Sequence, residues 1–226
     1  NIPQVFNGTL NCCPTITPLP DQIACDSYTL PAISGTLLSG SEAYFTGSNG
    51  TGTTYFPGDV MTSSVTPLYI YDDIGTCSDE DTVNITINTT PVADAPADVT
   101  ACDGYVLPAL SVGNYFSATG GTGSIAVGTN ITSTQTIFVY AETSTTPNCT
   151  DENSFTVTIN TTPVADAPTD VTACDGYVLP ALSVGNYFSS TGGVGSIAVG
   201  TNITSTQTIF VYAETSTTPN CTDENS

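Results

Sequence analysis

The sequence predicts an all-β protein made of tandem immunoglobulin-like β-sandwich modules in a linear array. Residues 91–154 recur almost unchanged at 163–226, a period of 72 residues. A fixed period of this length is typical of an array of modules. Short segments alternate apolar and polar residues, which indicates half-buried strands, and no segment shows the apolar period of a helix. Several short strands in each period fit a small immunoglobulin-like sandwich.

The strands of the second period can be placed in chain order. Residues 98–102, 105–110, 115–118 and 124–127 are expected to form the first strands, separated by Gly and Asn turns. Residues 136–141 are rich in β-branched and aromatic side chains, which favour a strong strand. Phe155, Val157 and Ile159 alternate with threonine and predict the last strand.

These segments divide the chain into four parts. Residues 1–17 match the last strand of a module plus a linker. Residues 18–90 form the first and most divergent module, residues 91–162 the second, and residues 163–226 a third that lacks its last strand.

The N-terminal segment has two interpretations. Residues 6–25 align without a gap to residues 155–174, so the chain begins with a copy of a module's last strand. The sequence is either a window on a longer array or a subunit that polymerises head to tail. In the second case Phe6, Thr9 and Leu10 belong to a donor strand that completes the third module of another copy by β-augmentation.

Composition excludes several classes of partner. The chain has no Lys, Arg or His against 21 Asp and Glu, so its net charge is −21. Nucleic acid is not expected as a partner, because neutralising phosphates requires Lys or Arg. No apolar run is long enough to insert in a membrane. Neighbouring modules should repel each other, and divalent cations are expected to offset that repulsion.

Eight cysteines at periodic positions indicate an oxidising, extracellular compartment. Equal cysteine separations in the second and third periods favour one bridge within each module. The expected pairs are Cys25–Cys77, Cys102–Cys149 and Cys174–Cys221. The alternative pairs, Cys77–Cys102 and Cys149–Cys174, would cross the junctions. Cys12 and Cys13 are expected to form a vicinal bridge or a cross-link to a neighbouring chain.

Carboxylates cluster at the predicted module ends, and hard oxygen ligands of this kind suit Ca²⁺. The candidate calcium ligands are Asp94, Asp98, Asp103, Asp151, Glu152, Asp166, Asp170, Asp175, Asp223 and Glu224. The alternative is a solvated acidic surface without a bound ion.

Catalysis is not expected. Activated nucleophiles commonly depend on His or Lys, and the chain has neither. A repeated carbohydrate-binding module would use Tyr115, Phe116 and Tyr140 as a sugar platform, whereas ordinary core and cross-strand packing explains the same aromatic residues.

The chain also resembles a recognisable protein family. The motifs are Cys-Asp-x-Tyr-x-Leu-Pro-Ala, Asn-Tyr-Phe, Gly-Gly-x-Gly and Thr-Gln-Thr-Ile-Phe-Val-Tyr-Ala-Glu, spread over about residues 18–226. Together they resemble the giant tandem-repeat surface proteins of Bacteroidota, including gliding and biofilm adhesins. The resemblance implies export, an immunoglobulin-like module, and a role in surface fibres or attachment.

Attached glycans are expected on such a surface protein. Asn-x-Ser/Thr triplets are abundant, and Asp81-Thr82-Val83 resembles a short O-glycosylation motif used in Bacteroidota. The candidate positions are Asn49, Asn84, Asn88, Asn130, Asn160, Asn202 and Thr82.

The function expected from these observations is that of a structural subunit in an extracellular cell-surface or matrix filament. The alternatives are the stalk of a repeat adhesin whose binding tip lies elsewhere, and a repeated carbohydrate-binding module.

Overall fold

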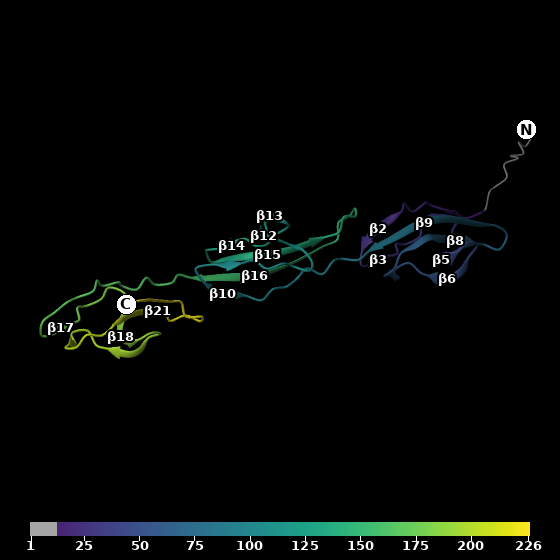
Figure 1. The fold of residues 1–226 in the computed structure, drawn as a ribbon. Coiled ribbons are helices and arrows are strands. Elements are labelled where there is room, and N and C mark those ends of the chain that lie inside the picture. Colours follow the sequence, from purple (N-terminus) through teal and green to yellow (C-terminus); the bar gives the residue numbers. More distant parts are fainter. Residues whose placement is uncertain (1–12) are drawn as a thin grey trace, which may run out of the picture. The chain divides into compact units, whose positions relative to one another are not determined.

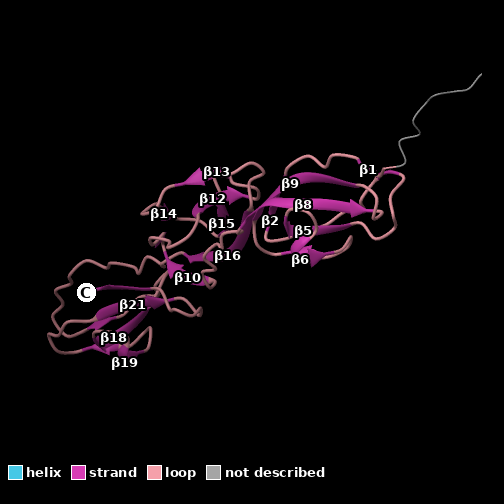
Figure 2. Ribbon diagram, turned by 90° about the vertical axis from the view of Figure 1, so that its right-hand side faces the viewer, coloured by secondary structure: helices cyan, strands magenta, loops and turns pink. Residues whose placement is uncertain are grey.

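The structure is a computed structural model that describes residues 13–226. These residues form strands, turns and loops and contain no helix, which confirms the predicted all-β class (Figures 1 and 2). The predicted donor-strand residues Phe6, Thr9 and Leu10, together with Cys12, lie outside the described part of the chain.

The chain divides into two compact units. The first comprises the described residues up to Val92 together with Glu142–Asp151. The second comprises Ala93–Ala141 and Glu152–Ser226. The tip of a hairpin from the second sequence repeat therefore belongs to the same unit as the first repeat.

The first unit contains a five-stranded sheet in the order β2-β9-β8-β5-β6 (Figure 1). Its strands are β2 (Gln22–Cys25), β9 (Ser78–Asn88), β8 (Val65–Asp73), β5 (Ala43–Gly47) and β6 (Thr51–Tyr55). The short pairs β1 (Thr15–Ile16) with β4 (Gly35–Thr36), and β3 (Tyr28–Thr29) with β7 (Val60–Met61), complete it. Strand β2 runs parallel to β9, whereas the other strands of the sheet pair antiparallel.

The second repeat builds a sheet of the same order, β10-β16-β15-β12-β13. Its strands are β10 (Val99–Cys102), β16 (Thr150–Asn160), β15 (Gln135–Glu142), β12 (Asn114–Ala118) and β13 (Thr122–Ile125), with the separate pair β11 (Tyr105–Val106) and β14 (Asn130–Ile131). Leu107 and Ile131 pack against Ile137, Val139 and Val157 of the sheet, which forms the two-layered core of a small sandwich. This arrangement confirms the predicted fold class.

The expected strand bounds mostly agree with those observed to within two residues, and two strands differ more. The segment 105–110 is a strand only at Tyr105–Val106. Pro108 has no N–H to continue a ladder, and Leu107 donates its backbone N–H to the Thr129 carbonyl oxygen at 3.0 Å. The strand predicted from Phe155, by contrast, begins earlier, at Thr150.

The third repeat forms a four-stranded sheet, β19-β18-β21-β22. The strands are β18 (Asn186–Ser190), β19 (Val194–Ile197), β21 (Phe210–Glu214) and β22 (Thr222–Asn225), with the pair β17 (Tyr177–Val178) and β20 (Asn202–Ile203). Residues 169–174, which correspond to β10 and the residues before it, do not form a strand.

Candidate functional site at the joints between repeats

Disulfides connect one sequence repeat to the next. Cys25 bonds to Cys149 within the first compact unit, and Cys102 bonds to Cys221 within the second. Both pairs have Cα atoms 5.6 Å apart. The predicted bridges within modules, Cys25–Cys77, Cys102–Cys149 and Cys174–Cys221, are therefore wrong. So are the alternative junction pairs Cys77–Cys102 and Cys149–Cys174.

The physical reason is the length of the last strand. Cys149 directly precedes β16, whereas Cys102 lies opposite Asn160, the last residue of that strand, in the parallel β10–β16 register. A strand of 11 residues spans roughly 35 Å. A disulfide requires Cα atoms within about 7 Å. The two cysteines of one repeat lie at opposite ends of the sheet and cannot meet.

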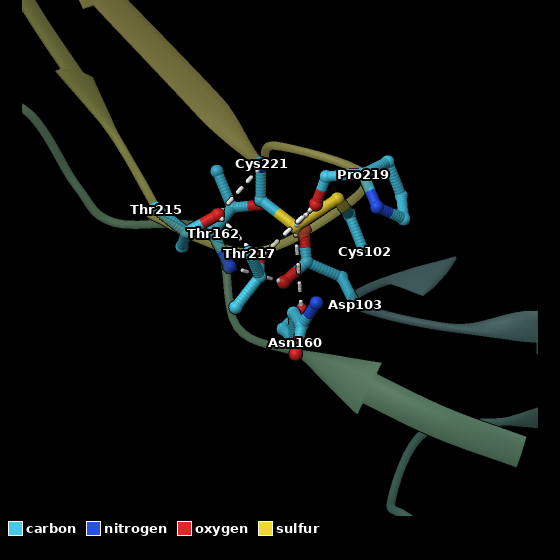
Figure 3. Close-up of a disulfide and its surroundings, with 8 residues drawn as sticks. All are labelled: Cys102, Asp103, Asn160, Thr162, Thr215, Thr217, Pro219 and Cys221. Carbon is cyan, nitrogen blue, oxygen red and sulfur yellow. Dashed lines mark hydrogen bonds between the residues drawn. A yellow bond between two sulfur atoms is a disulfide. The ribbon is translucent and has the colours of Figure 1, made fainter. Parts of the chain in front are cut away.

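The loop cysteine is held in a closed hairpin tip. Cys221 donates its backbone N–H to the Thr215 hydroxyl at 2.9 Å, and Thr215 donates its N–H to the Cys221 carbonyl at 3.0 Å. The Thr215 and Thr217 hydroxyls are 2.8 Å apart, and Thr217 donates to the Pro219 carbonyl oxygen at 3.1 Å (Figure 3). The tip of the second repeat has the same bonds between Thr143 and Cys149. These hydrogen bonds hold the cysteine in a defined position at the end of the segment Thr-Ser-Thr-Thr-Pro-Asn-Cys, which occurs at residues 143–149 and 215–221.

A second attachment reinforces each joint beside the disulfide. Asp103 donates its backbone N–H to the Asn160 carbonyl oxygen at 2.9 Å, and its carboxylate accepts from the Thr162 N–H at 2.9 Å and from the Thr162 hydroxyl at 2.5 Å (Figure 3). The Cys221 sulfur lies 3.9 Å from the same Asn160 oxygen. A disulfide sulfur carries no hydrogen, so this approach is a contact without a hydrogen bond.

The first joint repeats this geometry with Asp26 and Thr90. The Asp26 carboxylate accepts from the Thr90 N–H at 2.8 Å and from its hydroxyl at 2.6 Å. Hydrogen bonds from Thr90 and Thr162 lower the pKa of Asp26 and Asp103 respectively, the side-chain bond contributing most. Asp26 and Asp103 adopt positive φ angles of 62° and 60°. Asp tolerates this region better than most residues, which explains why Asp follows Cys in the motif.

Cys13 has the role that a cysteine of the preceding repeat has at the other two joints. It bonds to Cys77, and the two Cα atoms are 5.6 Å apart. Cys77 precedes β9 as Cys149 precedes β16, so it is the loop cysteine of the first repeat. Neither the vicinal bridge nor the inter-chain link predicted for Cys13 is therefore present. Among the described cysteines, Cys174 is free, and it is exposed.

The third repeat contains a groove where the second repeat has a filled core. The groove has a volume of about 520 Å³ and is lined by Val171, Cys174, Leu179, Tyr187, Ile209 and Val211 among others. In the second repeat, Phe155 and Val157 of β16 fill the corresponding space. As a result Ile137 is 0 % exposed, whereas Ile209, which follows it by one period, is partly exposed.

The candidate calcium ligands do not gather. Within residues 13–226 no three acidic or cysteine side chains lie together as a metal site would require. Most of the carboxylates instead accept a hydrogen bond from a backbone N–H. The pairs are Asp94 with Ser111, Asp98 with Thr156, Asp103 with Thr162, Glu152 with Gly120, Asp166 with Ser183, Asp223 with Ala165 and Glu224 with Gly192. Asp170 and Asp175 are exposed, and Asp151 is half-buried. The arrangement does not fit a calcium site, and calcium binding stays a prediction.

The aromatic residues considered for a sugar platform lie on different faces. Tyr115 is fully buried in the core. Phe116 follows it in β12 and points to the opposite face, where it packs edge-on against Tyr140 with ring centroids 5.9 Å apart. A Cβ at Gly121 would lie 3.0 Å from the Tyr140 ring, so the glycine covers that ring closely. This arrangement favours ordinary packing over a sugar platform.

The candidate glycosylation positions differ in accessibility. Asn49, Asn84, Asn130, Asn202 and Thr82 are exposed. Asn88 and Asn160 are half-buried, and both supply carbonyl oxygens to the joints. The Asn160 side-chain nitrogen is buried. The exposed positions are therefore the more suitable acceptors, and glycosylation stays a prediction.

The sequence matches no known protein-family model, and a comparison with curated proteins finds no significant relative. Distant likenesses exist among solved structures. Titin domains Z1Z2, solved in complex with telethonin, are 13% identical over 66% of this chain and 98% of that chain, with a TM-score of 0.27. Mouse cadherin-23 EC22–24 is 10% identical over 93% and 94%, with a TM-score of 0.29. The four N-terminal immunoglobulin domains of Dscam1 isoform 4.4 are 12% identical over 68% and 45%, with a TM-score of 0.24.

Identities and TM-scores this low support no inference about function. The disulfides Cys13–Cys77, Cys25–Cys149 and Cys102–Cys221 among the described residues indicate a protein of extracellular type. In the part of the chain from Cys13 onward, the structure has no helix long and apolar enough to cross a membrane.

Proposed function

We propose that this protein is a structural subunit of an extracellular filament whose successive β-sandwich repeats are clamped together covalently. The observation that carries the proposal is the pairing Cys25–Cys149 and Cys102–Cys221, in which each bridge connects one repeat to the next. Bridges that only stabilised individual modules would not need to cross between repeats.

The clamps suit a chain that has to bear tension. Each joint has two covalent paths, the linker and the disulfide, and an Asp–Thr attachment lies beside them. Tension on the linker is therefore shared with the disulfide. With no Lys or Arg, and a net charge of −21, conventional ion pairs cannot offset the repulsion between repeats. Disulfides hold the repeats together at any ionic strength.

The N-terminal sequence and the groove of the third repeat support head-to-tail assembly through donor strands. Residues 6–11 align with residues 155–160 of β16, and the groove of the third repeat corresponds to the space that β16 fills in the second. The occupant we propose is the N-terminal segment of a second copy, which would add a strand by β-augmentation. By this alignment Phe6, Gly8 and Leu10 match Phe155, Val157 and Ile159, and Asn7 and Thr9 match the threonines between them.

The test is electron microscopy and analytical ultracentrifugation of the 226-residue chain and two matched variants. Leu10→Asp should abolish assembly, because it would place a charge in an apolar groove. Thr9→Asp, one residue away on the opposite face, should leave assembly intact. Assembly that survives Leu10→Asp, or a wild-type chain that stays monomeric at every concentration, would contradict the donor-strand filament.

A stalk of a longer adhesin is the alternative function. It would use the same joints, with the following repeat of one continuous chain filling the groove. Glycans, which the sequence predicts, are compatible with either function. A monomeric 226-residue chain that binds a synthetic peptide of residues 155–160 in the groove would favour the stalk.

A further inference from the structure

We infer that Cys174 forms a disulfide with Cys77 of the next copy by displacing Cys13, so that filament growth includes a thiol–disulfide exchange. The inference rests on the proposed head-to-tail filament. It gives roles to the free cysteine of the third repeat and to the Cys13–Cys77 bridge, which differs from the other two joints.

The two observed joints define where Cys174 must bond. Cys25 and Cys102 each lie opposite the last residue of the neighbouring long strand, Asn88 and Asn160 respectively. Each bonds to the loop cysteine of the following repeat. Cys174 is the third cysteine of this series, one period after Cys102, and it is a free thiol exposed in the wall of the groove.

Cys77 is the matching partner. It directly precedes β9, as Cys149 precedes β16 and Cys221 precedes β22. Of these three loop cysteines, Cys77 alone is bonded to a residue outside the Cys25, Cys102 and Cys174 series. Its present partner, Cys13, aligns with Thr162, which lies two residues beyond Asn160.

Insertion of the donor strand would bring the three sulfurs together. With residues 6–11 of the next copy in the groove, Asn11 would occupy the place of Asn160, opposite Cys174. In the observed joint the loop-cysteine sulfur lies 3.9 Å from the Asn160 carbonyl oxygen. Cys77 of the incoming copy would therefore reach the position beside Cys174 that Cys221 holds beside Cys102.

The exchange needs no added oxidant. The Cys174 thiol loses its proton, and the thiolate attacks the Cys77 sulfur of the incoming copy. The Cys174–Cys77 bond forms as the Cys13–Cys77 bond breaks, and Cys13 leaves as a thiolate that takes up a proton. One disulfide is consumed and one is made. The product is a bond from Cys174 to the loop cysteine of the following repeat, as at the two internal joints, but it connects two chains.

Replacement of threonine by cysteine at position 13 fits this sequence of events. At the internal joints Thr90 and Thr162 bind the Asp26 and Asp103 carboxylates through N–H and hydroxyl. Cys13 has no hydroxyl for the corresponding Asp175. Its side chain instead protects Cys77 until a neighbouring chain arrives.

The test follows assembly of the 226-residue chain under anaerobic conditions without oxidant, with peptide mapping under non-reducing conditions. Assembled material should give a ladder on non-reducing gels and a cross-linked peptide containing Cys174 and Cys77. Cys13 should become open to alkylation as Cys174 becomes protected. A cross-link of Cys174 to Cys12 or Cys13, or filaments that separate fully into monomers in non-reducing detergent, would overturn the exchange.

Two variants separate this inference from the filament itself. Cys174→Ser should still assemble by electron microscopy, because the donor strand is intact, but should give no ladder. The double variant Cys12→Ser, Cys13→Ser leaves Cys77 as a thiol, so it should also assemble without a ladder when oxidant is absent. A ladder in this double variant under these conditions would contradict the exchange. A wild-type chain that forms no filaments would instead contradict the proposed function.

Discussion

Asp103 holds Thr162 by two hydrogen bonds, one from the backbone N–H at 2.9 Å and one from the hydroxyl at 2.5 Å. Thr162 follows the last strand of the second repeat, and Asp103 follows Cys102, so the attachment lies next to the disulfide that leads to the third repeat. Because the carboxylate accepts both bonds in its ionised form, protonation should weaken this part of the joint.

Asp103→Asn tests that dependence on charge. Hydrogen bonds from Thr162 lower the pKa of Asp103 below its ordinary value of 3.8. The stabilisation is therefore present above pH 3.8 and is lost as the pH falls through the lower folded-state pKa. Asn tolerates the positive φ angle, so the variant changes mainly the charge. We expect a lower unfolding temperature than wild type at pH 7 and a difference that shrinks as the pH falls below 3.8, measured by calorimetry.

Asp175→Asn is the matched control for this experiment. Asp175 follows Cys174 as Asp103 follows Cys102, but it is exposed and lies beside the open groove. The substitution should leave the unfolding temperature of the unassembled chain unchanged. Equal effects of the two substitutions would contradict a specific role for the Asp103–Thr162 attachment.

The double variant Cys102→Ser, Cys221→Ser tests the disulfide between the second and third repeats. The bond closes a sequence separation of 119 residues. Removing a native disulfide of this kind should lower the free energy of unfolding by about 2–4 kcal/mol, chiefly through the unfolded chain. Urea unfolding measures the change, and Cys174→Ser, which removes an exposed free thiol, should leave the free energy unchanged. A double variant as stable as wild type would show that the joint adds no stability.

Tyr44→Phe and Tyr115→Phe form a second matched pair, because the two tyrosines occupy equivalent positions in β5 and β12. The Tyr44 hydroxyl donates to the Pro31 carbonyl oxygen at 3.0 Å, whereas the Tyr115 hydroxyl is buried without a hydrogen-bond partner among the described residues. Tyr44→Phe should cost about 1 kcal/mol of unfolding free energy at pH 7, and Tyr115→Phe should cost nothing or stabilise. A larger cost for Tyr115→Phe in urea unfolding would contradict the assigned hydrogen bonds.

The same tyrosine predicts a loss of stability at alkaline pH. Burial, followed by the proximity of Tyr28, raises the pKa of Tyr44 from 10.0 to about 12. Stability from the neutral phenol is complete below pH 10 and is lost as the pH rises through about 12. Tyr44→Phe should therefore show a weaker fall in unfolding temperature between pH 10 and 12 than wild type. Equal falls in the two proteins would show that Tyr44 ionises no less readily when folded.

The fold class was predictable from the sequence, but the cysteine pairing was not. Alternation at Phe155, Val157 and Ile159 is local and predicted the end of β16 correctly. Its first half contains Asp151 and Glu152, two of the candidate calcium ligands, and these polar residues show no apolar alternation that would predict a strand. Pairing of β10 with β16 joins residues about 60 positions apart, and no local pattern encodes it.

A correct length for the last strand would have excluded the predicted bridges. Once the strand runs from Thr150 to Asn160, Cys149 and Cys102 lie at its two ends. The signal for the joints was present in the motif itself, since Cys is followed by Asp, and Thr follows Asn by two positions, in both of the first two repeats. These four residues can be assigned to one joint only when the parallel strands β10 and β16 are known to end side by side.

The last prediction compares the filled core with the groove. Ile137 is 0 % exposed beneath Phe155 and Val157, whereas Ile209, its equivalent in the third repeat, is partly exposed. Ile137→Ala should therefore cost about 2–5 kcal/mol of unfolding free energy, as buried isoleucines do. Ile209→Ala should cost clearly less in the unassembled chain, because the side chain loses less burial. Both variants are measured by urea unfolding in a Leu10→Asp background that prevents assembly. A synthetic peptide of residues 155–160 should then bind in the groove. Its addition should raise the free-energy cost of Ile209→Ala towards that of Ile137→Ala. Equal costs without the peptide would mean that the core around Ile209 is already closed, and that no strand is needed to complete it.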